Sequence, residues 1–204
     1  MKPSLAQRFV TAFLEGGRWK LYLQGLGTTM ELTVIALIFG VLLGLVVAVI
    51  RSAHDQQRIG RKNPVLGILN VLCQIYTTVI RGTPMLVQLF IWTFVIFPTQ
   101  RNKVLVAFIG LGVNSGAYVA EIIRGGLMSV DAGQSEAGRS LGLSYFDTMR
   151  FIVIPQAFKN ILPSLGNEFI TLFKDTSLAQ AIGGAEMLYY ASTIGGRTFD
   201  YMPP

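Results

Sequence analysis

Two apolar stretches of the sequence carry side chains that are able to hold a charged ligand. Around 104–123 the small and polar residues recur every three or four positions, so they share one face of a helix. These residues are Gly110, Asn114, Tyr118, Glu121 and Gly125. In 161–182 four ionisable or hydroxyl side chains are consecutive, at Lys174, Asp175, Thr176 and Ser177. Ionisable groups are costly in apolar segments unless they pair or line a wet cavity, so both stretches are expected to face a pathway or an interface.

The sequence contains no set of residues suited to enzymatic catalysis. It has no G-x-x-x-x-G-K-[ST] phosphate loop, no Ser-His-Asp set and no ligand cluster for zinc. The single histidine, His54, lies in a charged loop, which indicates a solvated side chain. The single cysteine, Cys73, lies in an apolar stretch and is expected to be a small core residue. We therefore predict a protein that is not an enzyme and holds no metal.

A polar segment at about 127–160 separates the two apolar stretches. Asp131 followed by Gln134, and Ser144 followed by Asp147, have the spacing of capping boxes, and Gly142 suits a left-handed helix end. Two short helices, at about 132–141 and 145–154, are predicted around a sharp and rigid turn. Pro155 is expected to end this hairpin.

The hairpin has the composition of a docking surface. Ala137 and Gly138 would let another backbone approach closely, and Leu141, Leu143 and Phe146 would be apolar anchors. A DNA-binding helix-turn-helix or an ordinary cytosolic hairpin is the alternative, and the flanking apolar segments count against it.

Composition indicates an integral membrane protein. Hydrophobic residues make up 51% of the chain and charged residues 14%, and the mean hydropathy is +0.52. The segment 32–50 has Thr33 as its only polar residue and would form about 28 Å of helix, enough to cross the hydrocarbon core. Gly40 and Gly44 share one face of it, where either another helix packs or a small-residue groove forms within the same subunit.

Basic residues flank the apolar segments and form no stripe with interleaved aromatics, so we predict no nucleic-acid partner. The segment 51–63 carries four basic residues against one acid, which marks the cytosol by the positive-inside rule. These residues are Arg51, Arg58, Arg61 and Lys62, with Asp55 as the acid. The first 20 residues also look cytosolic by charge, but 51–63 and the hairpin together place that end outside.

Three further spans are predicted. The segment 64–97 is broken at Arg81, Gly82 and Pro84, and is expected to form one long bent element. The segments 104–123 and 161–182 follow, and hydropathy alone is expected to miss the second because of its ionisable residues. The remainder, 183–204, is expected to be an outer loop with a short interfacial helix.

The hairpin resembles the coupling loop of the permeases of binding-protein-dependent ABC importers. That loop reads Glu-Ala-Ala, three residues, Gly, nine residues, Ile, one residue and Leu-Pro. Here Glu136, Ala137, Gly138, Gly142, Ile152, Ile154 and Pro155 stand at those positions, with Gly138 and Ile154 as the two departures. The segments 81–90, 114–126 and 166–177 look like those of permeases for polar amino acids, so the resemblance covers about 25–200.

The resemblance implies an all-α, polytopic integral membrane helical bundle in the bacterial cytoplasmic membrane, with 1–204 as one permease domain. It implies four spans here and a fifth missing at the C-terminus, so we expect a truncated chain. The implied function is transport of an amino acid by alternating access, coupled through 136–155 to a separate ATPase dimer that holds ATP and magnesium. A second permease subunit, identical or related, and an extracytoplasmic solute-binding protein are the other implied partners.

If this function is right, the chemistry of individual residues suggests their roles. Glu136 and Arg139 are candidates for contact with the ATPase, whereas Gly142 sets the turn. Glu121 or Asp175 would meet the substrate ammonium and Lys174 its carboxylate, with Asn114, Tyr118, Thr176 and Ser177 beside them. Alternatively, Lys174 and Asp175 pair with each other or with Arg81. An ion-coupled transporter or channel, or a membrane scaffold without transport, remains the alternative function.

Overall fold

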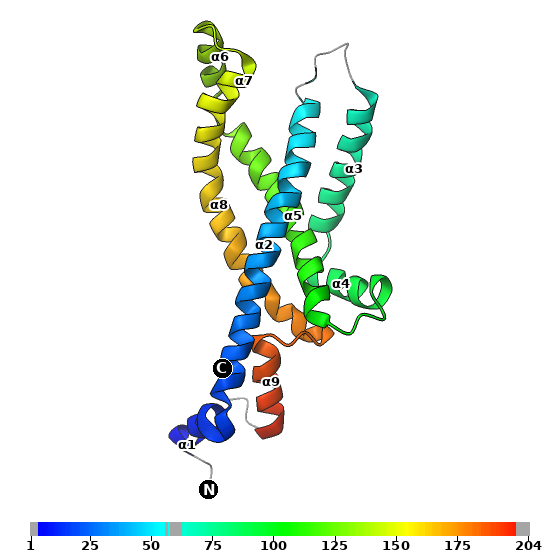
Figure 1. Ribbon diagram of the computed structural model, residues 1–204, viewed down its shortest axis with the longest axis vertical. Coiled ribbons are helices and arrows are strands. Elements are labelled where there is room, and N and C mark those ends of the chain that lie inside the picture. The colour runs from blue at the N-terminus through cyan, green and yellow to red at the C-terminus, as the bar shows by residue number, and fades with distance from the viewer. Residues whose placement is uncertain (1–3, 56, 58–62, 199–204) are drawn as a thin grey trace. The chain divides into compact units, whose positions relative to one another are not determined.

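The computed structural model describes residues 4–55, 57 and 63–198, and every regular element in this part of the chain is helical (Figure 1). In chain order the elements are α1 (Leu5–Phe9), the π-turn η1 (Val10–Leu14), the 3-10 turn η2 (Glu15–Gly17), α2 (Trp19–Asp55), α3 (Pro64–Arg81), α4 (Met85–Phe90), the π-turn η3 (Ile91–Ile96), α5 (Lys103–Met128), α6 (Ala132–Ser140), α7 (Tyr145–Thr148), the π-turn η4 (Met149–Val153), α8 (Ile154–Asp175), the 3-10 turn η5 (Thr176–Ile182) and α9 (Met187–Thr198).

The chain forms two compact units. The first unit, which we call the α9 unit, comprises 1–36, 84–111 and 172–204, and the second, the hairpin unit, comprises 37–83 and 112–171. The boundary between the units falls within α2, α5 and α8, so each of these three helices contributes residues to both units. The single domain over 1–204 stays a prediction.

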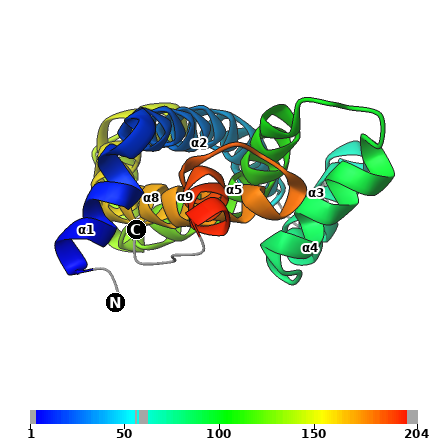
Figure 2. The ribbon, with the colours of Figure 1, turned by 90° about the horizontal axis from the view of Figure 1, so that it is seen from below.

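The α9 unit is built around the start of α2. Tyr22 forms a buried cluster with Ala191 and Ile194 of α9, which lies beside these first turns (Figure 2). At Gly25 a Cβ atom would stand 2.7 Å from Cα of Met187, so only glycine lets the two backbones approach this closely. Glu186, just before α9, accepts hydrogen bonds from the backbone N–H groups at 188 and 189, both at 2.8 Å, and thereby caps the helix.

The hairpin unit is built on close packing between α2 and α5. A Cβ atom at Gly40 would lie 2.7 Å from Oγ of Ser115, and one at Gly44 would lie 2.8 Å from Cβ of Val119. The small residues of α2 therefore form a groove that α5 of the same chain fills. Of the two alternatives for Gly40 and Gly44, the groove within one subunit is the one observed. Cys73 is buried in the adjoining cluster, as predicted.

The predicted spans are largely confirmed as helices. The segments 32–50 and 104–123 lie within α2 and α5. Among the described residues, three helices are long and apolar enough to cross a membrane, namely α2, α3 and α5. The predicted fourth span is helical to Asp175 and continues as the 3-10 turn η5, and hydropathy misses it as expected. A short helix, α9, is confirmed within 183–204.

The prediction of one bent element over 64–97 is wrong. The chain forms two helices, α3 ending at Arg81 and α4 beginning at Met85. Pro84 has an extended backbone, with ψ of 137°, and its ring removes the N–H that a continuous helix would need. With 18 residues, α3 is long enough to cross by itself. Three basic residues of the predicted cytosolic segment, at 58, 61 and 62, lie outside the described residues.

Large apolar side chains remain exposed along one side of α2. Ile38, Leu42, Val46 and Val49 recur every three or four residues and are each more than half exposed. A continuous apolar stripe of this kind is unfavourable in water and suits contact with lipid. The apolar helices therefore belong to an integral membrane protein.

Candidate coupling hairpin and charged cluster

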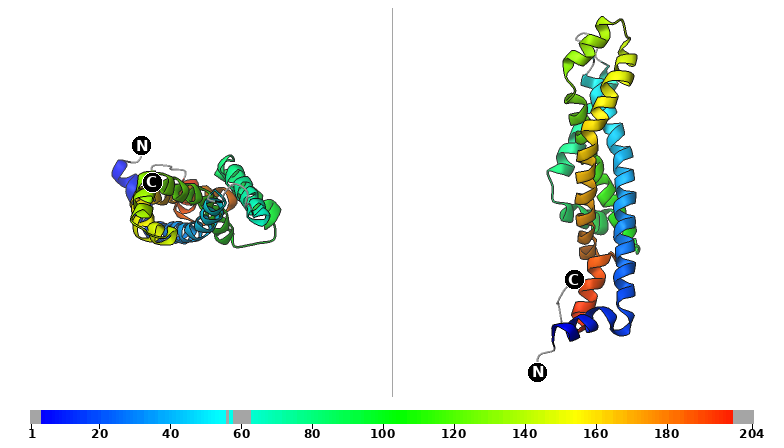
Figure 3. Two further views of the ribbon diagram at one scale, coloured as in Figure 1. Left: turned by 90° about the horizontal axis from the view of Figure 1, so that it is seen from above. Right: turned by 90° about the vertical axis from the view of Figure 1, so that its left-hand side faces the viewer.

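The hairpin predicted at 127–160 is present, and it forms one end of the hairpin unit (Figure 3). Oδ1 of Asp131 accepts from the N–H of Gly133 at 2.7 Å, and Oγ of Ser144 accepts from the N–H of Asp147 at 3.1 Å. Both predicted N-caps are thus confirmed. In a capping box the side chain of Gln134 would accept from the backbone N–H of Asp131. Here Oε1 of Gln134 accepts instead from Nε2 of Gln156 at 3.2 Å, across the hairpin.

The turn of the hairpin is closed by a Schellman motif. Gly142 has φ of +82°, and its N–H bonds to the carbonyl of Arg139 at 3.0 Å. The N–H of Leu143 bonds to the carbonyl of Gly138 at 3.1 Å, which completes the pattern of a helix ended by a left-handed residue. The role predicted for Gly142 is therefore confirmed.

Gly138 and Ile152 lie where the two arms of the hairpin meet. Gly138 is buried, and a Cβ atom on it would stand 2.9 Å from the side chain of Thr148 and 3.2 Å from Cδ1 of Ile152. These residues let the two arms of the hairpin approach each other, and their part in coupling to an ATPase stays a prediction. Ala137 is exposed beside them.

The outer surface of the hairpin combines charge with exposed apolar side chains. Leu141 is 80% exposed and Phe146 67% exposed, and Glu136 and Arg139 are exposed as well. Within the described part of the hairpin unit these two apolar groups stay largely uncovered, and burying them would be favourable. This surface is suited to insertion into the groove of another protein.

Pro155 does not end the hairpin, contrary to prediction. The second arm runs through α7 and the π-turn η4 directly into α8. A π-turn widens the helix by one residue, which accommodates a proline that cannot donate a hydrogen bond. The hairpin is therefore joined rigidly to a helix that extends to Asp175.

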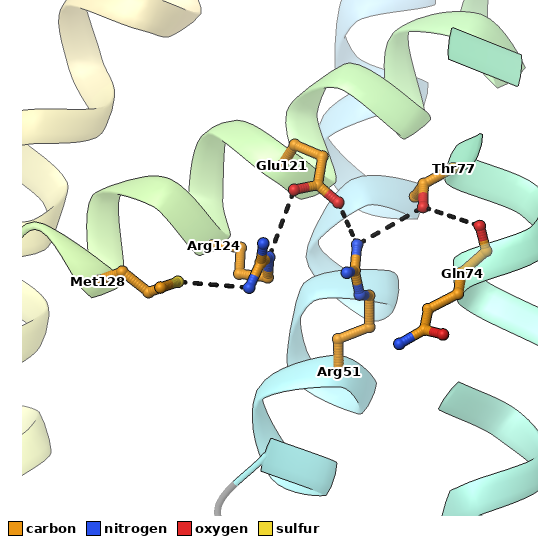
Figure 4. Close-up of polar contacts among 6 residues, drawn as sticks. All are labelled: Arg51, Gln74, Thr77, Glu121, Arg124 and Met128. Carbon is orange, nitrogen blue, oxygen red and sulfur yellow. Dashed lines mark hydrogen bonds and ion pairs between the residues drawn. The ribbon is translucent and has the colours of Figure 1, made fainter. Parts of the chain in front are cut away.

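A charged cluster connects three helices of the hairpin unit (Figure 4). Arg51 of α2 donates to Oε1 of Glu121 on α5, and Nε of Arg124 lies 3.3 Å from Oε2 of the same carboxylate. The Arg51 guanidinium also reaches Oγ1 of Thr77 on α3 at 3.5 Å. The side chains of Arg51 and Glu121 are only 13% and 21% exposed, so this pair is largely removed from solvent.

The sequence predicts Glu121 as a ligand for a substrate ammonium, and Arg51 as one of the basic residues that mark the cytosolic side. In the structure both oxygens of Glu121 are occupied by guanidinium groups. Arg51 and Thr77 were missed as site residues. Arg51 could have been found from the sequence, because an ionised glutamate inside an apolar helix needs a cationic partner and Arg51 directly follows an apolar span.

The other predicted pathway residues divide between the two units. In the hairpin unit Asn114 is buried, and the guanidinium of Arg81 lies 5.3 Å from the centroid of the Tyr118 ring, as a cation–π contact. In the α9 unit Thr176 is buried, and Oγ of Ser177 donates to the carbonyl of Lys174 at 2.7 Å. Within the described part of the chain no ion pair joins Lys174 to Asp175, so that alternative is not observed.

Comparison with known proteins agrees with the resemblance found in the sequence. Residues 64–202 match the family model described as "Binding-protein-dependent transport system inner membrane component". The chain is 39% identical over 183 residues to the probable amino-acid ABC transporter permease protein YckA of Bacillus subtilis, covering 88% of this chain and 76% of that one. The arginine transport system permease protein ArtQ of the same organism is 36% identical over 185 residues, covering 89% and 80%.

Solved structures give the same result. The crystal structure of an amino acid ABC transporter with histidines aligns with a TM-score of 0.79 and 39% identity, covering 90% of this chain and 81% of that chain. An inward-facing MetNI methionine ABC transporter aligns with a TM-score of 0.70 over 93% and 84% at 20% identity, which supports the fold alone. The chain therefore belongs to the family of binding-protein-dependent transport system inner membrane components, among the amino-acid ABC transporter permeases.

Proposed function

We propose that this chain is the membrane-spanning subunit of an ATP-driven importer that carries a polar or charged amino acid across the bacterial cytoplasmic membrane. Relatives are named for arginine, glutamine and cystine transport, which favours this substrate class. A separate ATPase dimer would hold ATP and magnesium. A second permease subunit and an extracytoplasmic solute-binding protein would complete the complex.

The observation that carries the proposal is the hairpin surface. Its turn is held by the Schellman motif at Gly142, and its second arm continues without interruption into α8. A force applied to exposed Phe146 and Leu141 would therefore reach a membrane helix without being lost in a flexible joint. ATP-driven closure of the partner would move the two hairpins of a permease pair together, and alternating access would follow.

Phe146→Ala tests this docking surface. Because Phe146 is 67% exposed, its truncation should affect the fold little, whereas truncating an aromatic anchor typically costs about 2 kcal/mol of binding, or about 30-fold in Kd. Affinity for the ATPase would be measured with the permease in lipid nanodiscs. ATP-dependent uptake would be measured in proteoliposomes that contain the ATPase and the solute-binding protein.

Phe94→Ala is the matched control, because Phe94 has a similar exposure of 63% but lies in the π-turn η3, outside the hairpin. We expect Phe146→Ala alone to weaken ATPase binding and uptake. Equal effects of the two substitutions would contradict docking through the hairpin. Flux of amino acids without the ATPase would instead support the channel or ion-coupled alternative.

A further inference from the structure

A cavity of about 680 Å³, open to the surface and lined by both polar and apolar groups, lies between the second half of α5 and the first half of α8 in the hairpin unit. Its walls include Glu121, Gly125, Ser129, Lys159, Asn160 and Pro163. This volume is within the range of small-molecule sites in proteins, about 300–1,000 Å³. The size and the mixture of polar groups with open space suit a small polar ligand.

The charges at the cavity favour an anionic group. Glu121 is the one carboxylate among the lining side chains, and Arg51 and Arg124 already neutralise both of its oxygens. Lys159 adds a further cation that is exposed at the wall. Three cations around one carboxylate leave the site positive, and the ammonium of Lys159 is the group most available to a ligand carboxylate.

Hydrogen-bond acceptors lie on the same wall. Nδ2 of Asn160 donates to Oγ of Ser129 at 2.8 Å, and that hydroxyl donates to the carbonyl of Gly126 at 2.8 Å. This chain of bonds orients the amide, so its Oδ1 remains as an acceptor. Pro163 has no N–H, and the carbonyl of Lys159, four residues earlier, therefore lacks its usual helical donor.

Gly125 keeps the cavity open. An added Cβ at this position would meet no atom within 4 Å, although its neighbour Gly126 would collide with Ile161. A side chain at 125 would thus project into empty space without disturbing the packing of α5 on α8. This makes the position a probe of the cavity that leaves the fold intact.

We propose that this cavity is an exit-side binding site for the transported amino acid, in which Lys159 receives the carboxylate, and the Lys159 carbonyl and Asn160 Oδ1 receive the ammonium. The proposal rests on the proposed function. Gly125 lies eleven residues beyond Asn114 on α5, about 16 Å nearer the hairpin along the helix, so the site is distinct from the predicted pathway residues at 114 and 118.

The test places a cysteine at Gly125 on a Cys73→Ala background and measures its rate of reaction with N-ethylmaleimide, a neutral reagent. The protein is the assembled complex with its ATPase in nanodiscs of phosphatidylcholine. Gly67→Cys is the matched control, because Gly67 on α3 also has open space around it and is not part of the cavity. Each amino acid that the wild-type complex transports in proteoliposomes is used as the protecting ligand.

We expect that a transported amino acid at ten times its dissociation constant slows modification at 125 about tenfold and leaves position 67 unchanged. Sodium acetate and methylamine, which each carry half of the ligand's charge, should protect much less. Lys159→Met should abolish the protection at 125.

Three results would overturn the proposal. Unprotected reaction at 125 in a complex that transports the amino acid would exclude the cavity while the proposed function stands. Protection by acetate alone, or by phosphatidylglycerol added to the nanodiscs, would assign the cavity to a simple anion or a lipid headgroup. A complex that transports no amino acid would refute the proposed function, and the exit site with it.

Discussion

The charged cluster predicts a large effect for Glu121→Gln. The substitution keeps the shape of the side chain and removes its charge, so Arg51, with 13% of its side chain exposed, loses its anion in a largely desolvated position. A hydrogen bond between charged groups at such a site contributes about 1.5–3 kcal/mol to the free energy of unfolding. The Arg124 contact, at 3.3 Å with 31% exposure, adds about 1 kcal/mol or less.

We therefore expect Glu121→Gln to lower the free energy of unfolding by about 2–3 kcal/mol, which corresponds to a fall in Tm of about 4–12 °C for a chain of this size. Thermal unfolding would be followed by intrinsic fluorescence in lipid nanodiscs. Glu31→Gln is the control, because Glu31 is exposed on α2 and such substitutions stay within about 0.5 kcal/mol.

A double-mutant cycle with Arg51→Gln separates the ion pair from other effects of each substitution. Because each single variant removes the same contact, the double variant should be more stable than the sum of the two losses implies, by at least about 1 kcal/mol. A Tm for Glu121→Gln equal to that of Glu31→Gln would refute the reasoning, since the cluster would then contribute nothing to the association of α2 with α5.

Two further predictions concern packing and burial. Gly126→Ala should lower the free energy of unfolding by about 1–3 kcal/mol, because its Cβ would collide with Ile161. Gly125→Ala should be tolerated, because its Cβ would meet no neighbouring atom. Equal Tm values for the two variants would contradict this packing of α5 on α8. Burial raises the pKa of Glu186 above its ordinary value of 4.5. The hydrogen bonds that its carboxylate accepts from two backbone N–H groups lower the pKa and offset part of this rise. The stability that protonated Glu186 contributes is complete below pH 4.5 and is lost as pH rises through the raised pKa. The Tm of the wild type should therefore fall relative to that of Glu186→Gln over that range. Parallel pH profiles of Tm for the two proteins would contradict a raised pKa.

Local chemistry in the sequence predicted the first helix of the hairpin and its turn to within a residue, but not where the second arm ends. The caps at Asp131 and Ser144 and the positive φ of Gly142 depend on residues at most five positions apart, so the sequence contains all of their determinants. The break at Pro84 is likewise a property of the proline ring. The apolar spans follow from length and hydropathy, which are also local.

Contacts between distant segments were decided only by the tertiary structure. The sequence showed Glu121 in an apolar helix but not that Arg51, 70 residues earlier, supplies its counter-ion. It showed Gly138 as a small residue, whereas packing against Thr148 made it an internal contact of the hairpin. Local patterns fix the backbone of a helix, but the partner of a buried side chain depends on which helix faces meet, and that is set by packing along the whole chain.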